Sequence, residues 1–510
     1  MKNCRFNSLN RLAMVMFFFL MATFAYAQNV PTFVGGGGNL LWSNPNNWSE
    51  GLKPVAGEFS VVVAADVLVD EDVLVTNLAY ANEPCSMAIQ AGKKLEITGN
   101  HAWNSSIDVV LENGAQLLTP TEVYAKVLMK VDAYDQETHT MEFIASPVVE
   151  PVTPSYGNGF LTDPDSGYSL VSFNEATLQW EDFKETPFDL ENGRGYVYAN
   201  ALDTILIYEG TIRGSASVDV RLDYHASNGP VAGYNLVGNP LPCNAYPNHS
   251  YYDLSYSGFS MLAVPASTFT AIPPCKGVFM KAENENETVA FNSTIGLQSA
   301  DNHGYITIDI TKSNAPGDVI DNAILSFNSG DDMGKVIIFS TQPNLYFSRD
   351  NKDYAIISVD SVDMQPLKFK AAENGSYTMH VEPKGREVAF MHLIDNITGL
   401  NVDLLANPDY TFMATTNDYA SRFKLVFRPD YGIEESENQN FAYYANGMVY
   451  INDVEAQDFA SLQIVDLTGR VVVSCCGHTR CVPTAGIAPG VYVLRLETQN
   501  GVRTQKLVIQ

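Results

Sequence analysis

Short runs of alternating apolar and polar residues, separated by Asn, Asp and Gly, recur along most of the chain. The clearest run is Tyr305 to Ile310, which alternates Ile with Thr and Asp. A period of two places alternate side chains on opposite faces of a β-strand. Strand-type runs occur at residues 60–63, 66–69, 73–75, 95–97, 107–111, 305–310, 322–327, 335–339, 354–359, 375–381 and 423–427. Little helical periodicity accompanies them, and 510 residues are too many for one domain, so the pattern predicts an all-β, multidomain fold.

Residues 28–120 are expected to form a β-solenoid-like segment or a small β domain. The phrases at residues 92–95 and 113–117 are about 20 residues apart and resemble the rungs of β-solenoid segments in bacterial surface proteins. A small sandwich is the alternative. Near the start of this segment, Trp42 and Trp48 flank an Asn-rich loop. We expect them to plug the end of the β-structure, with stacking on sugar rings as the alternative.

Residues 121–300 contain an internal echo that predicts a β-sandwich module. Gly195 and Gly277 each enter a strand that leads through a polar hairpin loop to a second strand. Between them, Asn239-Pro240 is a turn signal after an apolar strand. With Ala145-Ser146-Pro147 upstream, this motif resembles a module of exported Bacteroidota proteins, and the resemblance implies no activity. The Gly and Asn residues are expected to satisfy backbone geometry.

Residues 301–430 predict a second β-sandwich module. Its strand-type run 422–427 begins with Arg422, which we expect to anchor a carboxylate inside the edge of the sandwich. Residues 431–445 are polar and acidic without a strand pattern, so they are interpreted as a linker that a processing protease could reach.

Residues 446–510 are interpreted as a small sandwich domain of short strands separated by turns. Asn500-Gly501 supplies the two positive-φ positions of a tight hairpin turn. The final run, residues 502–510, alternates as an edge strand with one wet face should. Three blocks stand out by order and spacing: residues 465–470 (Val-Asp-Leu-Thr-Gly-Arg), 487–492 (Ile-Ala-Pro-Gly-Val-Tyr) and 506–509 (Lys-Leu-Val-Ile).

These three blocks resemble the C-terminal sorting domain of the type IX secretion system of Bacteroidota. The motif residues are Asp466, Gly469, Arg470, Pro489, Gly490, Tyr492 and Lys506. The resemblance implies an Ig-like sandwich that the type IX secretion machinery recognises at the outer membrane. It also implies that the sorting domain is removed and that the remaining chain is released or attached to the cell surface. The alternative is an ordinary terminal Ig-like domain.

The first 27 residues are expected to be a secretory signal peptide. Basic residues at positions 2, 5 and 11 precede an apolar run from Leu12 to Phe24, and Ala25-Tyr26-Ala27 fits a cleavage site. The run is too short for a comfortable membrane span, and no later stretch approaches 18 apolar residues, so no transmembrane helix is predicted.

The charge of the chain argues against a nucleic-acid partner. The formal net charge is −28, and loss of the signal would leave 27 basic and 58 acidic residues, a net of −31. Phosphate backbones are bound by clustered Lys and Arg, which such a composition does not favour.

Six cysteines would remain after signal cleavage, and an even number in an exported protein permits disulfides. Cys243 and Cys275 are the candidate disulfide of the middle region. Cys481 is expected to pair with either Cys475 or Cys476. A metal site is the alternative there, with His478 as the candidate ligand, but the spacing does not support it, and no metal site is predicted.

No catalytic constellation is evident, so no catalytic residue and no cofactor are predicted. Residues 330–335 lack the Ser or Thr of a phosphate loop. Asp163 and Asp165 lack the other ligands of a calcium loop. Glu181 and Asp182 are adjacent on a strand and therefore point to opposite faces, which does not suit a glycosidase pair.

The sequence therefore favours a non-enzymatic, exported β-protein on the cell surface or released from it. An adhesin or binding scaffold with a glycan or host matrix protein as partner is the leading hypothesis. The alternatives are a secreted glycan-acting hydrolase with dispersed carboxylates and a structural surface-layer component.

Overall fold

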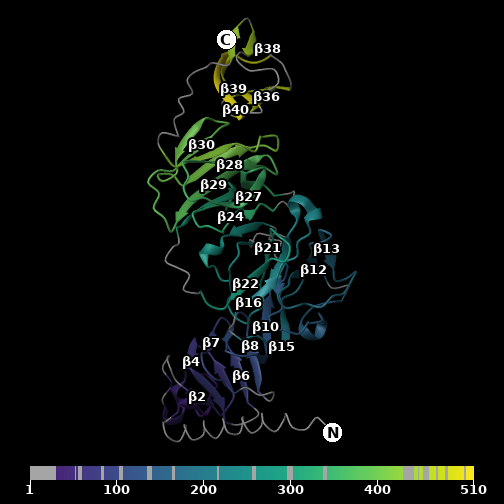
Figure 1. The fold of residues 1–510 in the computed structure, drawn as a ribbon, viewed down its shortest axis with the longest axis vertical. Coiled ribbons are helices and arrows are strands. Elements are labelled where there is room, and N and C mark those ends of the chain that lie inside the picture. The colour runs from purple at the N-terminus through teal and green to yellow at the C-terminus, as the bar shows by residue number, and fades with distance from the viewer. Residues whose placement is uncertain are drawn as a thin grey trace. The chain divides into compact units, whose positions relative to one another are not determined.

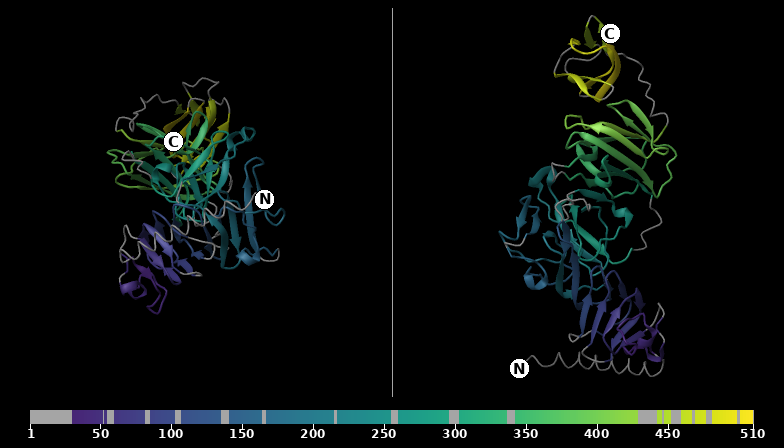
Figure 2. Two further views of the ribbon diagram at one scale, coloured as in Figure 1. Left: turned by 60° about the horizontal axis from the view of Figure 1, so that its bottom comes forward. Right: turned by 180° about the vertical axis from the view of Figure 1, so that it is seen from behind.

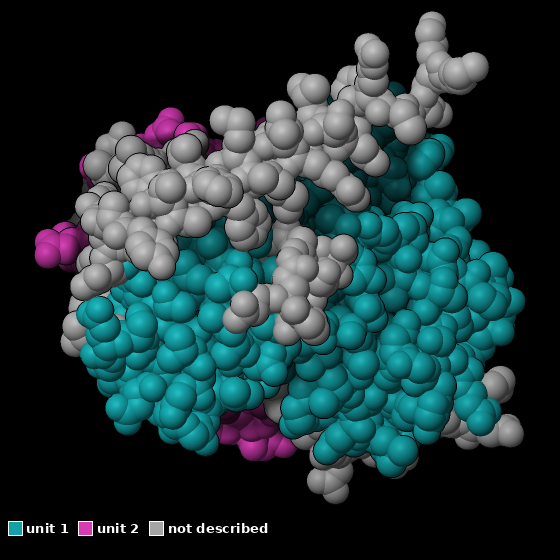
Figure 3. Space-filling model, turned by 90° about the horizontal axis from the view of Figure 1, so that it is seen from below, with its two compact units in different colours: residues 1–259, 264–301 teal, residues 260–263, 302–510 magenta. Residues whose placement is uncertain are grey.

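The structure is a computed structural model that describes residues 30–51, 53–54, 60–81, 85–102, 107–134, 141–163, 167–214, 217–254, 260–295, 303–336, 342–428, 442–445, 447–451, 459–466, 469–476, 481–498 and 501–509. It divides into two compact units, coloured separately in Figure 3. Unit 1 comprises Met1–Phe259 and Val264–Asp301, and unit 2 comprises Ser260–Ala263 and Asn302–Gln510. The predicted signal peptide and most of the predicted linker lie outside the described residues.

Both units are built from β-strands, which confirms the predicted all-β, multidomain fold (Figures 1 and 2). The helical turns of the described residues are the short 3-10 elements η1 (Pro45–Asn47), η2 (Ser49–Gly51), η3 (Tyr156–Asn158), η4 (Ala226–Val231) and η5 (Ala266–Thr268). None of the described residues forms a helix long and apolar enough to span a membrane.

The first nine strands of unit 1 pair in parallel and form three groups. They are β1 (Thr32–Phe33), β2 (Ser60–Val63), β3 (Val67–Val69), β4 (Val73–Val75), β5 (Asn77–Tyr80), β6 (Ser86–Ile89), β7 (Lys94–Ile97), β8 (Asp108–Leu111) and β9 (Gln116–Leu118). The sheets run β1-β2-β5, β3-β6-β8 and β4-β7-β9. Val67 lies beside Met87, which in turn lies beside Val109. Parallel neighbours so close in sequence require the chain to turn fully between them, as in stacked coils.

Alternation places the apolar side chains of these parallel strands in the core. In β2, for example, Val61 and Val63 are buried and the residues before each are half-buried. Gly92 and Gly114 occupy the turns before β7 and β9 with φ of 69° and 70°, a left-handed conformation that glycine adopts without strain. The amide of Gly92 donates to the carbonyl of Asn113 at 3.1 Å, so the two turns are tied together.

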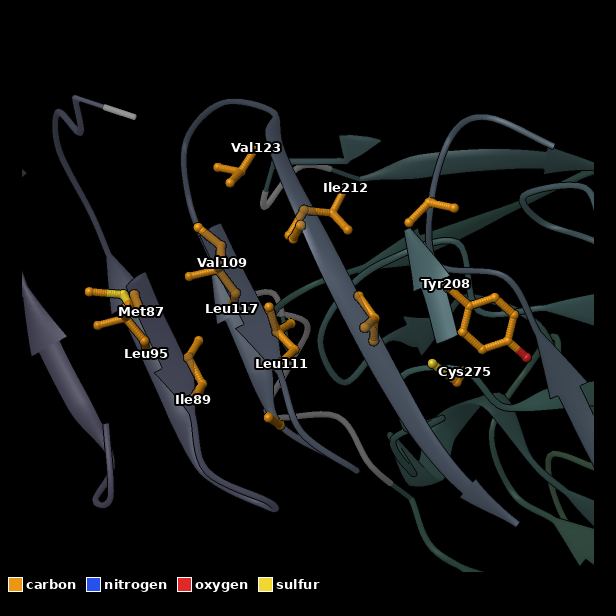
Figure 4. Packing of buried hydrophobic residues seen from close by; sticks show 14 of the residues in the cluster. Met87, Ile89, Leu95, Val109, Leu111, Leu117, Val123, Tyr208, Ile212 and Cys275 are labelled. Carbon is orange, nitrogen blue, oxygen red and sulfur yellow. The ribbon is translucent and has the colours of Figure 1, made fainter. Parts of the chain in front are cut away.

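The sheet of β3, β6 and β8 continues past the boundary predicted at residue 120. β10 (Val123–Val131) pairs in parallel with β8 and antiparallel with β15 (Thr204–Ile212), giving the order β15-β10-β8-β6-β3. Figure 4 shows the continuous packing of side chains from Met87 to Tyr208 and Cys275. The two predicted segments therefore share one sheet and one hydrophobic cluster.

The remainder of unit 1 consists of antiparallel sheets. Its strands are β11 (Glu142–Ala145), β12 (Tyr168–Asn174), β13 (Gln179–Asp182), β14 (Gly195–Asn200), β16 (Val218–Arg221), β17 (Tyr234–Gly238), β18 (Tyr246–Pro247), β19 (Tyr251–Leu254), β21 (Gly277–Lys281) and β22 (Thr288–Asn292). The strand orders are β11-β14-β12-β13 and β16-β22-β18, and β21 lies between β17 and β19. The echo seen in the sequence corresponds to β14 followed by β15 and to β21 followed by β22, and Gly195 and Gly277 begin β14 and β21. The two strands of each echo belong to different sheets, so the predicted hairpins are wrong.

Asn239, in the Asn-Pro motif after β17, is completely buried and acts as a structural tie. Its amide nitrogen donates to the carbonyls of Cys243, Ile272 and Pro273 at 2.8–3.0 Å. Its Oδ1 accepts from the amide of Leu241 at 2.9 Å. The prediction that this Asn satisfies backbone geometry is thus confirmed.

Unit 2 begins with a sheet that folds over on itself. Its strands are β23 (Tyr305–Lys312), β24 (Ala315–Ser326), β25 (Met333–Gly334), β26 (Asn344–Arg349), β27 (Lys352–Ser358), β28 (Met364–Lys370), β29 (Gly375–Lys384), β30 (His392–Asp395), β31 (Leu400–Asp403), β32 (Asp409–Ala414) and β33 (Phe423–Val426). The order is β31-β30-β33-β28-β26-β27-β24-β23-β29-β32, with β25 on β27. Phe412 of β32 and Phe423 of β33 lie near opposite ends of this order, yet their rings are 4.9 Å apart. Both ends of the sheet therefore share one core. Residues 260–263, which include the first three residues of β20 (Met261–Val264), also belong to this unit. The amide of Ala263 donates a 2.8 Å hydrogen bond to Asn322 Oδ1.

Arg422 anchors a carboxylate in this core, as the sequence predicts. Its Nε and Nη2 donate to the two oxygens of Asp395 at 3.0 and 2.7 Å, and Nη1 donates to the carbonyl of Met413. Tyr410 also donates to Asp395, at 2.8 Å. Burial and the neighbouring carboxylate raise the pKa of Tyr410 to about 12.

The last part of unit 2 is a two-sheet sandwich. Its strands are β34 (Ala442–Ala445), β35 (Met448–Ile451), β36 (Phe459–Asp466), β37 (Val471–Cys476), β38 (Cys481–Pro483), β39 (Gly490–Thr498) and β40 (Gly501–Ile509). One sheet has the order β34-β35-β38 and the other β37-β36-β39-β40. The edge position of β40 and its alternation agree with the predicted edge strand: Leu507 and Ile509 are buried, and Val508 is 48% exposed.

The predicted linker is wrong at its C-terminal end. Residues Ala442–Ala445 form strand β34, which pairs with β35. Ala442 is buried in the core of the sandwich, and the antiparallel register from Ala442 with Ile451 to Ala445 with Met448 lays this strand directly along β35. An Asn-Gly pair between two apolar runs is a hairpin signal, and it identifies β34 from the sequence.

Candidate functional site

The first sorting motif forms a closed turn between β36 and β37. The Asp466 carboxylate accepts hydrogen bonds from the amide and the Nε of Arg470, both at 3.0 Å. Gly469 has φ of 83°, and its amide donates to the carbonyl of Asp466 at 2.9 Å. The Arg470 side chain is 77% exposed, so the turn presents a guanidinium to solvent at an anchored position.

The second motif leads into β39. Pro489 is exposed, and Gly490 begins the strand opposite Ile509. The ring of Tyr492 is part of the sandwich core, and its hydroxyl donates to the carbonyl of Ala488 at 2.7 Å. This bond fixes the approach of the chain to the strand, which explains why a Tyr follows the Pro-Gly pair at this spacing.

The third motif lies on the edge strand β40. Lys506 is exposed and pairs in register with Val493. Beside it, the Gln505 side chain accepts from the amide of Ala442 at 2.9 Å and donates to its carbonyl at 2.5 Å. Gln505 therefore fastens β40 to β34 and joins the two sheets at this edge.

Register brings the three motifs together. Asp466 is paired with Tyr492, and Tyr492 is paired with Leu507, across the neighbouring strands β36, β39 and β40. All three blocks lie at the same end of the four-stranded sheet. At this end of the sheet Arg470 is anchored and exposed, and Lys506 is exposed on the edge strand.

The predicted Cys243–Cys275 disulfide is not formed. Both cysteines are free and buried, but they belong to different hydrophobic clusters. Burial raises the pKa of Cys243 to about 12 and raises that of Cys275 further, so both remain thiols and pack as small apolar groups. Cys475 and Cys481 are also free, and the side chain of Cys476, like His478, lies outside the described residues.

The tryptophans of the N-terminal loop plug the β-structure. Trp42 and Trp48 are 1% and 2% exposed, and their rings meet edge-to-face at 4.7 Å. Trp48 Nε1 also donates to the carbonyl of Trp42 at 2.8 Å. Neither ring presents a face to solvent, so sugar stacking on them does not occur in this conformation.

The sequence segments examined for chemistry have structural roles. Glu181 of β13 accepts from Asn174 at 2.6 Å, whereas Asp182 accepts from the amide of Lys184 at 2.8 Å. Lys335, at the end of the rejected phosphate-loop segment, is buried and paired with Asp321 at 2.5 Å. Residues 164–166, which include Asp165, lie outside the described residues. The described residues contain no group of three or more metal-ligating side chains.

Sequence reasoning missed a polar pocket of about 470 Å³ in unit 1. It is lined by the end of β12, the residues just before β14 and just after β15, all of β16 and the middle of β17. Three arginines are among its lining residues, Arg194, Arg213 and Arg221. Four carboxylates also line it, from Glu175, Glu191, Asp219 and Asp223.

Glu175 organises one side of this pocket. Its carboxylate accepts from the amide of Gly233 at 2.7 Å, from the amide of His225 at 3.1 Å and from His225 Nδ1. Burial alone would raise the pKa of Glu175, but these hydrogen bonds outweigh it and lower the pKa. The same contact raises the pKa of His225. The pair therefore holds residues 225–233 against β12.

A two-sheet sandwich with three aligned motifs at one end defines the class: a recognition module for protein export. Residues 445–510 match the family model of the secretion system C-terminal sorting domain. The chain therefore carries the sorting domain of the type IX secretion system, which indicates that it is exported and that the secretion machinery is a partner. No curated protein is similar enough to the sequence to count as a match.

Proposed function

We propose that the protein is a binding protein of the adhesin type, displayed on the cell surface or released from it, with a glycan or host matrix protein as partner. The observation that carries the proposal is the sorting domain at residues 445–510, which accompanies an otherwise all-β chain. An exported chain meets its partners outside the cell, and rigid β-units suit a binding role. The polar pocket of unit 1 supports it further.

Export is tested in a bacterium that has the type IX system. We expect a chain without residues 445–510 to accumulate inside the outer membrane, while the full chain reaches the surface or the medium. A matched reporter fused to residues 442–510 should be exported. Equal export of the full and truncated chains would refute the role of the sorting domain.

Binding is tested with residues 28–441 on an array of glycans and matrix proteins. Saturable binding to one class of partner is expected. A blank array would refute the adhesin proposal, and self-assembly of the purified protein would then favour a surface-layer component.

The pocket favours one second candidate, a glycan-acting hydrolase, because it brings together four carboxylates that are dispersed in the sequence. Glycosidases use two carboxyl groups across a cleft, one of which must be protonated. The lowered pKa of Glu175 suits a permanent carboxylate, and Glu191, Asp219 and Asp223 are the other acidic residues of the lining. Turnover of a polysaccharide panel that is lost in Glu191→Gln or Asp219→Asn would support this candidate.

A further inference from the structure

The arginines of unit 1 are concentrated at one place. Between residues 28 and 301 the sequence contains three arginines, Arg194, Arg213 and Arg221. All three line the polar pocket, whereas its described lining contains no lysine. Arginine differs from lysine in its planar fork of donors, which matches a carboxylate or phosphate in two-point contact. The composition of the pocket therefore indicates selection for the guanidinium group itself.

Two of these guanidinium groups are held by neutral amides. Arg213 Nε donates to Asn192 Oδ1 at 3.2 Å, and Arg221 Nη2 donates to Asn286 Oδ1 at 2.8 Å. Within the described part of the chain, no carboxylate lies at ion-pair distance from Arg194, Arg213 or Arg221. Within that part of the chain, their positive charges are therefore not neutralised by an ion pair.

The residues that position Arg213 and Arg194 are themselves held by hydrogen bonds to the backbone. The Asn192 amide nitrogen donates to the carbonyls of Ser146 and Pro240, both at 3.1 Å, which orients its Oδ1 toward Arg213. Gly193 has φ of 85°, and its carbonyl accepts from the amide of Gly238 at 3.0 Å, so the backbone that carries Arg194 is tied to β17. A preorganised set of donors loses little entropy when a ligand binds.

The other side of the pocket supplies acceptors. Asp219 and Asp223 are exposed at its wall, and Glu191 lies at the turn before Arg194. These carboxylates repel a multiply charged phosphate, but they accept hydrogen bonds from hydroxyl groups. The pocket volume also lies within the range of about 300–1,000 Å³ that is typical of small-molecule sites.

We infer that this pocket binds an acidic saccharide, with the arginines pairing with the carboxylate of a uronic acid and the acidic residues accepting from sugar hydroxyls. One negative charge beside several hydroxyl donors satisfies both sets of groups, which neither a neutral sugar nor a phosphate does. The inference rests on the proposed binding function and names the ligand class of this site.

The experiment is calorimetric titration of the chain from residue 28 to 510 with trigalacturonic acid and, as a matched neutral probe, its methyl ester. We expect the acid to bind and the ester to bind at least tenfold more weakly. Arg194→Gln and Arg213→Gln should each weaken binding of the acid at least tenfold, and Arg213→Lys should not restore it. Arg428→Gln, an exposed arginine of unit 2 paired with Asp363, is the control and should bind like the wild type.

Folding is checked by tryptophan emission, because all four tryptophans lie in unit 1. Equal binding of acid and ester, unchanged binding in both folded pocket variants, or no binding of the acid would each overturn the inference. If the array then still detects a partner that binds the pocket variants as well as the wild type, the proposed binding function stands without this pocket. If the array is blank as well, both fail.

Discussion

Replacing Asp395 by Ala should unfold the first part of unit 2 at much lower denaturant. Asp395 and Arg422 are 1% and 3% exposed in their side chains, and they form a two-point ion pair. The substitution removes the two-point partner of the buried guanidinium and leaves only the more distant Asp418 carboxylate, 3.6 Å from Nη1. Tyr410 loses its hydrogen-bond acceptor in the same step.

The size of the effect follows from burial. Breaking a buried ion pair by removing one partner costs about 3–5 kcal/mol, because the remaining charge is not compensated. With a urea dependence of about 2 kcal/mol per molar, a loss of about 4 kcal/mol lowers the midpoint by about 2 M. The double variant Asp395→Leu with Arg422→Met removes both charges, so it should be more stable than Asp395→Ala.

Hydrogen-exchange mass spectrometry across a urea series measures this, since it resolves peptides of residues 303–428 from the rest. Tryptophan emission is an internal control, because all four tryptophans belong to unit 1 and their transition should not move. A midpoint shift below about 0.5 M in Asp395→Ala would contradict the magnitude expected for a buried pair. A double variant no better than the single one would contradict the explanation by an uncompensated charge.

Three further predictions follow from particular contacts. The Glu175–His225 pair should protect the amide of Gly233 from exchange best between about pH 4.5 and 6.5, the ordinary pKa values of the two groups. Because the pKa of Glu175 is lowered, the stability that this carboxylate contributes is complete at a pH above its ordinary pKa and is lost as the pH falls through the lowered pKa. Because the pKa of His225 is raised, the stability that this imidazole contributes is complete at a pH below its ordinary pKa and is lost as the pH rises through the raised pKa. The variant Glu175→Gln should flatten this pH profile of protection. Gln505→Ala should lower the free energy of unfolding by about 1–2 kcal/mol and speed proteolysis at Ala442, since it removes both hydrogen bonds to the Ala442 backbone. Substitution of its exposed neighbour, Thr504→Ala, should have neither effect. Gly238→Ala should destabilise unit 1 by more than about 2 kcal/mol, because a Cβ would meet Ala145 Cβ and the Arg194 carbonyl oxygen at 2.5 Å; Gly157→Ala, whose nearest contact would be 3.8 Å, should be neutral when thermal unfolding is followed by tryptophan emission.

Local signals in the sequence predicted the features that depend on neighbours in the chain. The Asp466–Arg470 turn closes within five residues, and the alternation in β40 needs only one adjacent strand. Arg422 was also predictable, since a charged residue that opens a strongly apolar strand needs a buried partner. Its partner Asp395 was not predictable, because that pairing depends on how the sheet folds over.

Pairings between distant segments were harder to infer. Cys243 and Cys275 are close enough in sequence to suggest a disulfide, but they lie in different hydrophobic clusters. The domain boundary expected at residue 120 does not separate two sheets, for a related reason. β10 adds to β8 in the same sheet, and no turn signal reveals whether the next strand extends a sheet or starts another.

The three arginines of the pocket are connected in the sequence by their scarcity rather than by a motif. Arg194, Arg213 and Arg221 each stand at the end or the start of a different strand, so no spacing motif connects them. Their scarcity does connect them, because a strongly acidic chain that keeps three arginines in 274 residues (28 to 301) has few places for them. Surface solubility is already supplied by acidic residues, so these arginines are not needed for it. Arginines retained against such a composition are therefore expected to share a ligand, and the variants at Arg194 and Arg213 test that reasoning directly.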